Sequence, residues 1–223
     1  MRVAVVIPAY QAAATIGEVV GQTLDVVPDA QVIVVDDGSD DGTGAQGLGT
    51  RAVVVTHPRN RGKGVALRSG IARACADGAE AIVTIDADGQ HPAADIPRLL
   101  QPIAAGAADL VLGARRRHGA MPVSRRLTNW LSATLASRIG HQAIQDAQTG
   151  FRAFTGAGGL AERVQPPGDR YEFEANFLLE ALRAGYRVTS VEVPTIYGAP
   201  SHFRYFGDTW RMARAFAQHL RLL

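Results

Sequence analysis

This sequence has little cysteine and no long apolar runs. It also lacks acidic residues in one central stretch. Among 223 residues there is one cysteine, Cys75, which excludes an intramolecular disulfide and a zinc site built from cysteines. No apolar run reaches the ~18–20 residues that span a bilayer, and no apolar signal segment precedes the first predicted strand. We therefore expect a cytoplasmic protein with one large domain, since 47% hydrophobic residues can form a sizeable core.

Two common nucleotide-binding motifs are also missing. The first predicted strand ends in Ile7-Pro8-Ala9-Tyr10 without a G-x-G-x-x-G, which disfavours a dinucleotide-binding Rossmann domain. The segment Asn60-Arg61-Gly62-Lys63-Gly64 has neither the first glycine nor the final Ser/Thr of a P-loop. It can still hold a phosphate at a helix N-terminus beside a lysine, or simply cap a turn.

Acidic residues are missing from the centre of the chain, where positive charge collects. From Leu110 to Gln145 there is no Asp or Glu, and the arginines are at positions 115, 116, 117, 125, 126 and 138. Such a stretch is typical of a solvated face, a phosphate site or a membrane-surface patch. The arginines do not alternate with a series of aromatic residues that could stack bases, so nucleic acid is not an expected partner.

Short Val- and Ile-rich runs alternate with helical patterns along the chain. This alternation predicts an α/β fold with a mostly parallel central sheet and helices on both faces. We expect strands at 3–7, 31–35, 52–56, 81–85, 109–112, 151–154 and 187–193, the last at a sheet edge. Expected helices cover 13–24, 65–76, 93–104, about 125–139 and 172–184, and a basic amphipathic helix covers 206–223.

The most informative motif follows the apolar run 81–85, where Asp86 and Asp88 precede a glycine turn and Gln90. Carboxylates at the carboxyl end of a strand lie where open α/β sheets bind ligands. Mg²⁺ or Mn²⁺ takes oxygen ligands there, usually one or two carboxylates together with substrate phosphates. The pair indicates a divalent cation bound against a nucleotide diphosphate, held by Asp88 with help from Asp86 and Gln90. An EF-hand fails because Pro97 occupies the position of the ligating Glu, which leaves helix capping as the alternative.

A second acidic strand end follows residues 31–35, in the segment Val35-Asp36-Asp37-Gly38-Ser39. An Asp at this position can accept hydrogen bonds from a base or ribose, and an Asx turn is an equally good interpretation. Glu172 and Glu174 differ, because they stand in the first turn of a predicted helix. Acids are stabilising there without any catalytic task.

The order and spacing of six motifs resemble those of the family 2 glycosyltransferases, in particular the dolichyl-phosphate mannose synthases and polyprenyl-phosphate glycosyltransferases. Between residues 3 and 200 the motifs are V-V-I-P-A-Y, V-D-D-G-S-D-D-G-T, N-R-G-K-G, D-A-D-G-Q-H-P, G-A-R and D-A-Q-T-G-F-R-A-F. The resemblance implies a GT-A (Rossmann-like) catalytic domain over residues 1–200, with 201–223 as a C-terminal helix. It also implies a metal-dependent, inverting transfer of a sugar from a nucleotide diphosphate, such as GDP-mannose or a UDP-sugar.

The resemblance assigns roles to individual residues as well. The residues that would line the nucleotide pocket are Pro8, Ala9, Tyr10, Val35 and Asp37, with Asp86 and Ala87 against the nucleotide sugar. The metal would be Mg²⁺ or Mn²⁺, bound by Asp88 and Gln90 with Asp86 beside them. The positively charged residues near the donor and acceptor phosphates would be Arg115, Arg126 and Arg152, and Asp146 would lie near the reacting centre. Apart from the resemblance, Lys63 is a candidate for adding positive charge at the donor diphosphate, and capping a turn is its alternative role.

The nature of the acceptor decides what Asp146 does. A polyprenyl phosphate is already anionic and needs no base, so Arg115 and Arg126 would position it at the membrane surface. A hydroxyl group on a soluble acceptor needs a base, for which Asp146 is the candidate. An ion pair with Arg152 or a turn cap is the alternative role of Asp146.

Other interpretations of the sequence stay open. An Asp-x-Asp motif suits the aspartyl nucleophile of a metal-dependent phosphatase, although that motif belongs on a first strand, and a catalytically silent nucleotide-sugar-binding module is a third possibility. Gln11-Ala12 stand where the family usually has Asn-Glu, which leaves guanine or uracil undecided, and Ser201-His202 stand where the family often has Ser-Lys. The helix at 206–223 would pack on its own domain, on a partner subunit in a homodimer, or on the cytoplasmic face of the membrane.

Overall fold

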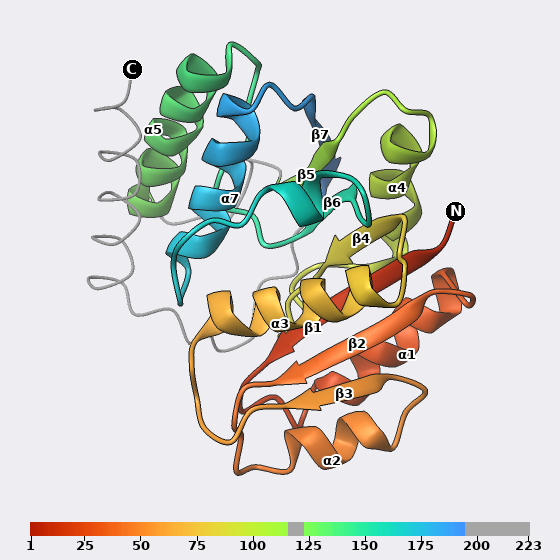
Figure 1. Ribbon diagram of the computed structural model, residues 1–223. Helices are drawn as coiled ribbons and strands as arrows, with labels where there is room; N and C mark the ends of the chain where they lie inside the picture. Colours follow the sequence, from red (N-terminus) through yellow and green to blue (C-terminus); the bar gives the residue numbers. More distant parts are fainter. Residues whose placement is uncertain (116–122, 195–223) are drawn as a thin grey trace.

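The computed structural model of the protein describes residues 1–115 and 123–194, and for 123–127 it describes the backbone alone. Within these ranges the strands form one seven-stranded sheet in the order β3-β2-β1-β4-β6-β5-β7 (Figure 1). The strands are β1 (Val3–Ala9), β2 (Gln31–Asp36), β3 (Val53–Thr56), β4 (Ala81–Thr84), β5 (Leu110–Arg115), β6 (Arg152–Thr155) and β7 (Val188–Val193). Only β6 runs antiparallel to its neighbours, β4 and β5, so the predicted mostly parallel sheet is confirmed.

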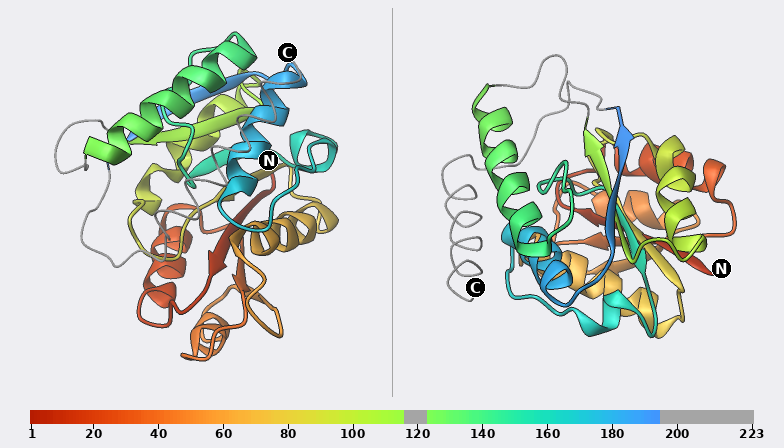
Figure 2. Two further views of the ribbon diagram at one scale, coloured as in Figure 1. Left: turned by 90° about the vertical axis from the view of Figure 1, so that its left-hand side faces the viewer. Right: turned by 90° about the horizontal axis from the view of Figure 1, so that it is seen from above.

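Helices cover both faces of this sheet, as Figure 2 shows. The helical segments are α1 (Ile16–Val26), α2 (Thr43–Leu48), α3 (Lys63–Ala76), the short 3₁₀ helix η1 (Ala93–Asp95), α4 (Ile96–Ala104), α5 (Val123–Gly140), α6 (Leu160–Arg163) and α7 (Glu172–Arg183). Helices α1, α2 and α4 lie on one face, whereas α3, α6 and α7 lie on the other, with α5 packed on α7.

The strand residues are apolar on both faces because both faces are buried. In β1, Val5 and Ile7 pack under α1 and α4, whereas Ala4 and Val6 pack under α3, and all four are fully buried. Burial of this kind on both faces explains why the strands read as continuous Val and Ile runs rather than as alternating patterns. The two apolar clusters together fix the position of every strand end that contributes to the site.

Several element boundaries differ from the sequence prediction. Helix α1 begins at Ile16 instead of residue 13, because the amides of Ala12 and Ala13 donate to the side chains of Thr43 and Asp41. Thr43 is also the first residue of α2, a short helix that the sequence pattern did not reveal. Strand β7 lies at a sheet edge as predicted.

The described helices can be compared with the length and apolar character that a membrane-spanning helix needs. In the ranges 1–115 and 123–194, no helix combines the length and the apolar character needed to cross a bilayer. The predicted helix at 206–223 and the end of the predicted catalytic domain near residue 200 lie outside the described residues. Dimerisation through that helix therefore stays a prediction.

Candidate active site

A cavity of about 710 Å³ opens at the carboxyl ends of β1, β2 and β4. Strand β1 pairs with β2 on one side and with β4 on the other, so the cavity lies where the direction of strand order changes, the usual ligand crevice of open α/β sheets. Its volume falls in the range typical of small-molecule sites. The lining includes Pro8, Ala9, Tyr10, Asp37, Lys63, Asp86, Ala87 and Asp88 of the predicted set, and also Gln11, Ala12, Ala14, Thr15, Asn60, Gly62, Ala66, Arg170 and Tyr171.

Lys63, the first residue of α3, crosses the cavity floor to two carboxylates. Its Nζ lies 2.7 Å from Oδ1 of Asp86 and 3.2 Å from Oε1 of Glu174. Burial opposes the charged form of Lys63, but these two carboxylates together raise its pKa. Burial likewise opposes the charged form of Asp86, yet Lys63 lowers the pKa of Asp86. The pair is therefore fully ionised at neutral pH.

Asp88 lies near this pair, and its negative charge is less well balanced by positive groups than that of Asp86. Its Oδ1 accepts a hydrogen bond from the amide of Gln90 at 3.0 Å. Burial, together with the negative charge of Asp86, raises the pKa of Asp88. Its ionised form is therefore poorly compensated, and a cation bound at this point would stabilise it.

The donor set fits a hard divalent cation that also binds substrate. Asp86 and Asp88 supply carboxylate oxygens at the rim of the cavity. Within the part of the chain that the structure describes, no group of three or more His, Cys, Asp or Glu side chains is arranged to hold a metal alone. Mg²⁺ behaves in this way when one or two carboxylates and substrate phosphates share its coordination.

Glu174 lies in the first turn of α7, as predicted, but its side chain also has a partner outside that helix. Its side chain is 10% exposed and faces Lys63, whereas Glu172 remains at the helix start and accepts from the amides of Asp169 and Arg170. A Cβ at Gly150 would lie 2.9 Å from both Oδ2 of Asp86 and Oε1 of Glu174, so the glycine leaves room for the two acids. No local sequence signal separates Glu174 from Glu172.

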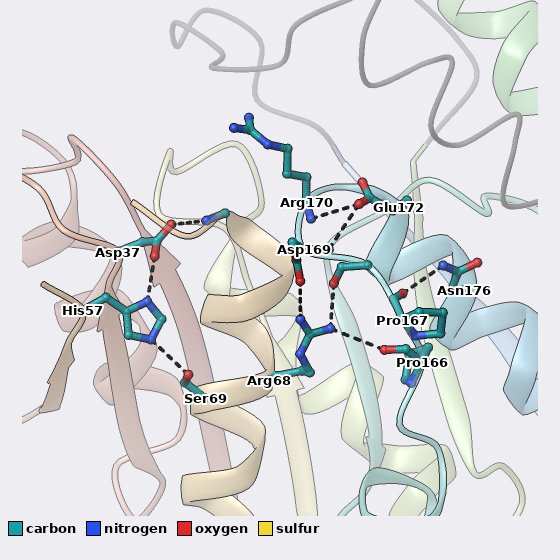
Figure 3. Close-up of polar contacts among 12 residues, drawn as sticks. Asp37, His57, Arg68, Ser69, Pro166, Pro167, Asp169, Arg170, Glu172 and Asn176 are labelled. Carbon is teal, nitrogen blue, oxygen red and sulfur yellow. Dashed lines mark hydrogen bonds and ion pairs between the residues drawn. The ribbon is translucent and has the colours of Figure 1, made fainter. Parts of the chain in front are cut away.

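Asp37 organises the loop that leads into α3 (Figure 3). Its carboxylate accepts from the amides of Arg61 and Gly62, at 3.0 and 2.7 Å, and lies 2.7 Å from Nδ1 of His57. The other ring nitrogen of His57 lies 3.0 Å from Oγ of Ser69 on α3. Asp37 lines the cavity as predicted, and its oxygens are largely occupied by this loop.

Asp146 is paired with Arg115 rather than with Arg152. The Arg115 guanidinium donates to both carboxylate oxygens, with Nε–Oδ2 at 2.7 Å and Nη2–Oδ1 at 3.1 Å, and the amide of Gln148 also donates to Oδ1. Asp146 is 1% exposed. Burial alone would raise its pKa, but Arg115 and the amide lower the pKa below its usual value. Asp146 is therefore a weak base in this arrangement.

This pairing makes the stability of the protein pH-dependent. Since the folded-state pKa of Asp146 is depressed, its stabilising contribution is present above the ordinary value of 3.8 and is lost as the pH falls through the folded pKa. We expect Asp146→Asn to lower the free energy of unfolding by about 3 kcal/mol at pH 7, with a smaller difference at pH 3. Urea denaturation of both proteins at the two pH values measures this, and an equal difference at both would contradict it.

Val35 and Arg152, like Arg115 and Asp146, are not among the residues that line the cavity. Val35 is fully buried against α3, with its Cγ2 close to the backbone of Gly70, so its side chain is a core residue. Arg152 is 2% exposed, and its guanidinium donates to the main-chain carbonyls of Thr149, Glu174 and Ala147. All three guanidinium nitrogens of Arg152 thus bond the backbone, and phosphate binding by Arg152 stays a prediction.

The remaining predicted residues are placed only in part. Arg126 lies in α5, but its side chain is outside the described part of the chain. The amide of Gln90 bonds Asp88, and the side chain of Gln90 does not line the cavity within the described residues. His91 is buried against Phe151, and burial lowers its pKa to about 4, which keeps the ring neutral at physiological pH.

The α/β fold is of the GT-A type, and an acidic strand end lies at its cavity. The family model of glycosyl transferase family 2 matches residues 4–162, more than half of the chain. The chain belongs to glycosyltransferase family 2, as the sequence motifs predicted.

Named relatives and solved structures are consistent with this assignment. The chain is 33% identical over 210 residues to an undecaprenyl-phosphate mannosyltransferase of Micrococcus luteus, covering 88% of this chain and 84% of that protein. It is 29% identical to a UDP-N-acetylglucosamine--dolichyl-phosphate N-acetylglucosaminyltransferase of Methanococcus voltae, covering 86% and 84%. Glucosyl-3-phosphoglycerate synthase of Mycobacterium tuberculosis, solved with Mn²⁺, UDP and phosphoglyceric acid, has the same fold, with a TM-score of 0.78, 22% identity and coverage of 98% and 78%.

Proposed function

We propose that this glycosyltransferase moves a hexose from a nucleotide diphosphate to a polyprenyl phosphate, with inversion at the anomeric carbon. An oxygen of the acceptor phosphate forms the new bond to the anomeric carbon. The bond from that carbon to the β-phosphate breaks, and the nucleotide diphosphate leaves with the electron pair. Relatives named for undecaprenyl- and dolichyl-phosphate transfer support this acceptor class.

The occupied carboxylate of Asp146 is the observation that carries the choice of acceptor. A hydroxyl acceptor needs a base, yet the oxygens of this candidate base are bonded to Arg115 and its pKa is lowered. A phosphate monoester is an anion at neutral pH and attacks without losing a proton. The geometry therefore favours an acceptor that brings its own negative charge.

The residues at the cavity rim would handle the charge of the donor. Asp86 and Asp88 would hold Mg²⁺ or Mn²⁺, which when bound supplies Lewis-acid stabilisation of the departing diphosphate. Lys63 lies on the same side of the cavity, within 2.7 Å of Asp86, and adds a second positive charge near the leaving group. Glu174 holds the ammonium group of Lys63 from the other side.

A two-stage experiment tests this proposal. Thermal unfolding with Mn²⁺ or Mg²⁺ and a panel of GDP- and UDP-sugars should identify one donor, since a ligand at 100 times its Kd stabilises the folded state by about 2.7 kcal/mol. That donor is then assayed with polyprenyl phosphate in liposomes and with free sugars. We expect transfer to the lipid phosphate, with the protein sedimenting with the liposomes as a peripheral protein. Transfer only to free sugars would overturn the acceptor assignment, and no stabilisation by any donor would overturn the whole proposal.

A further inference from the structure

Arg170 belongs to a loop that two helices hold in place, residues 166–171 (Figure 3). The guanidinium of Arg68, on α3, donates to the carbonyl of Gly168 at 2.6 Å and pairs with Asp169 at 2.7 Å. From α7, the side-chain amide of Asn176 donates to the carbonyl of Pro167 at 2.9 Å. The backbone that carries Arg170 is therefore fixed before any ligand binds.

The same loop packs tightly against the start of α3. The amide of Gly64 donates to the carbonyl of Asp169 at 2.9 Å. Gly62 has φ near +100°, and a Cβ there would overlap the carbonyl oxygen of Asp169 and lie 3.1 Å from Cγ of Arg170. Glycine at position 62 thus allows the Arg170 side chain to lie directly beside the loop that Asp37 organises.

The guanidinium of Arg170 has N–H donors available for a ligand. Its backbone amide donates to Glu172, but among the described residues its guanidinium makes no hydrogen bond or ion pair. The side chain lines the cavity and points away from Arg68 and Glu172 in Figure 3. The structure therefore holds an exposed cation on a rigid support at the cavity wall.

The position of Arg170 along the cavity indicates which part of the donor it would meet. Gly62, beside Arg170, bonds Asp37 at the end of β2, whereas Tyr171 lies beside Lys63, which bonds Asp86 beyond β4. Strand β1 separates β2 from β4, so these two ends lie about 10 Å apart. In the proposed function the diphosphate would lie at the Asp86 end and the nucleoside toward Asp37, and Arg170, whose Cγ lies beside Gly62, stands on the Asp37 side.

We propose that Arg170 binds the nucleoside of the donor by laying its guanidinium against the base, a role that rests on the proposed function of the cavity. A planar guanidinium stacks on aromatic rings, and a base presents such a face whatever its identity. Asp37 is the residue expected to bind the base, but its carboxylate already accepts hydrogen bonds from the amides of Arg61 and Gly62. Arg170 supplies the contact that this occupied carboxylate does not.

Calorimetric binding to the purified protein tests this role without any turnover. Wild type, Arg170→Ala and Arg170→Lys are titrated with UDP and GDP in the presence of Mn²⁺, and then with the monophosphate and the nucleoside of the base that binds. A matched control is Arg163→Ala, which removes an exposed arginine side chain of α6 that makes no hydrogen bond or ion pair among the described residues. We expect Arg170→Ala to weaken all three ligands about tenfold by the same factor, and lysine not to restore binding.

The alternative outcomes are distinct. A loss that grows with the number of phosphates and is restored by lysine would assign Arg170 to the diphosphate and overturn the nucleoside contact. Unchanged binding in Arg170→Ala would overturn it as well, while leaving the proposed function intact. If wild type bound neither UDP nor GDP, the proposed function would fail first and this role with it.

Discussion

Asp88→Ala is expected to lower kcat about a thousandfold while the protein stays folded. The Asp88 carboxylate lies at the cavity rim and would share the divalent cation that stabilises the departing diphosphate. Loss of such stabilisation costs about 4 kcal/mol in the transition state, which corresponds to that factor. Initial rates with the donor identified by thermal shift, at saturating Mn²⁺, measure the effect.

The stability of the same variant provides an independent check. Burial and the charge of Asp86 raise the pKa of Asp88, so its ionised form is less favourable in the folded protein than in the unfolded chain above pH 4. Removing the carboxylate should therefore leave the melting temperature equal or higher. Asp25→Ala, which removes an exposed acid on α1, serves as the control and should change neither activity nor stability. Full activity in Asp88→Ala would refute the metal role.

Arg152→Met is expected to have the largest effect on stability, lowering the free energy of unfolding by about 3–5 kcal/mol. The guanidinium of Arg152 is buried and donates to three main-chain carbonyls, which methionine would leave without these donors. The carboxylates of Asp146 and Glu174, both nearby, would also lose a compensating charge. Urea denaturation at pH 7 gives the magnitude.

The conservative replacement separates geometry from charge. Arg152→Lys keeps the positive charge, but one ammonium group cannot reproduce the planar fork that bonds three carbonyls in different directions. We therefore expect most of the loss to persist in Arg152→Lys. Arg163→Ala, on the exposed side of α6, should stay within about 0.5 kcal/mol of wild type. Recovery of full stability by lysine would show that charge alone matters at position 152.

The parallel half of the sheet could be predicted because each strand, and the acid that follows it, can be recognised from a few consecutive residues. Strands β1, β2 and β4 are short, mainly apolar runs buried on both faces, and the acidic ends of β2 and β4 mark the cavity edge in sequence as they do in space. For this reason Pro8, Asp37, Asp86 and Asp88 all lie where the motifs indicated.

The remainder of the site depends on contacts that sequence spacing does not reveal. Lys63 and Glu174 are far apart in the chain, and α3 and α7 bring them together. An ion pair with Arg152, a few residues away, was one of the roles left open for Asp146, but Asp146 pairs with Arg115 and the Arg152 guanidinium bonds the backbone. Local pattern therefore placed the acids at the strand ends but could not choose their partners.

The antiparallel strand β6 also has a consequence for how the chain folds during synthesis. Strands β4 and β5 are made early, yet each pairs with β6, whose residues come only after α5. Until residues 152–155 emerge from the ribosome, β4 has an open edge and β5 has no partner on that side. The nascent chain therefore carries an exposed strand edge, the kind of surface that chaperones protect, before Arg170 and Tyr171 of the cavity lining are made.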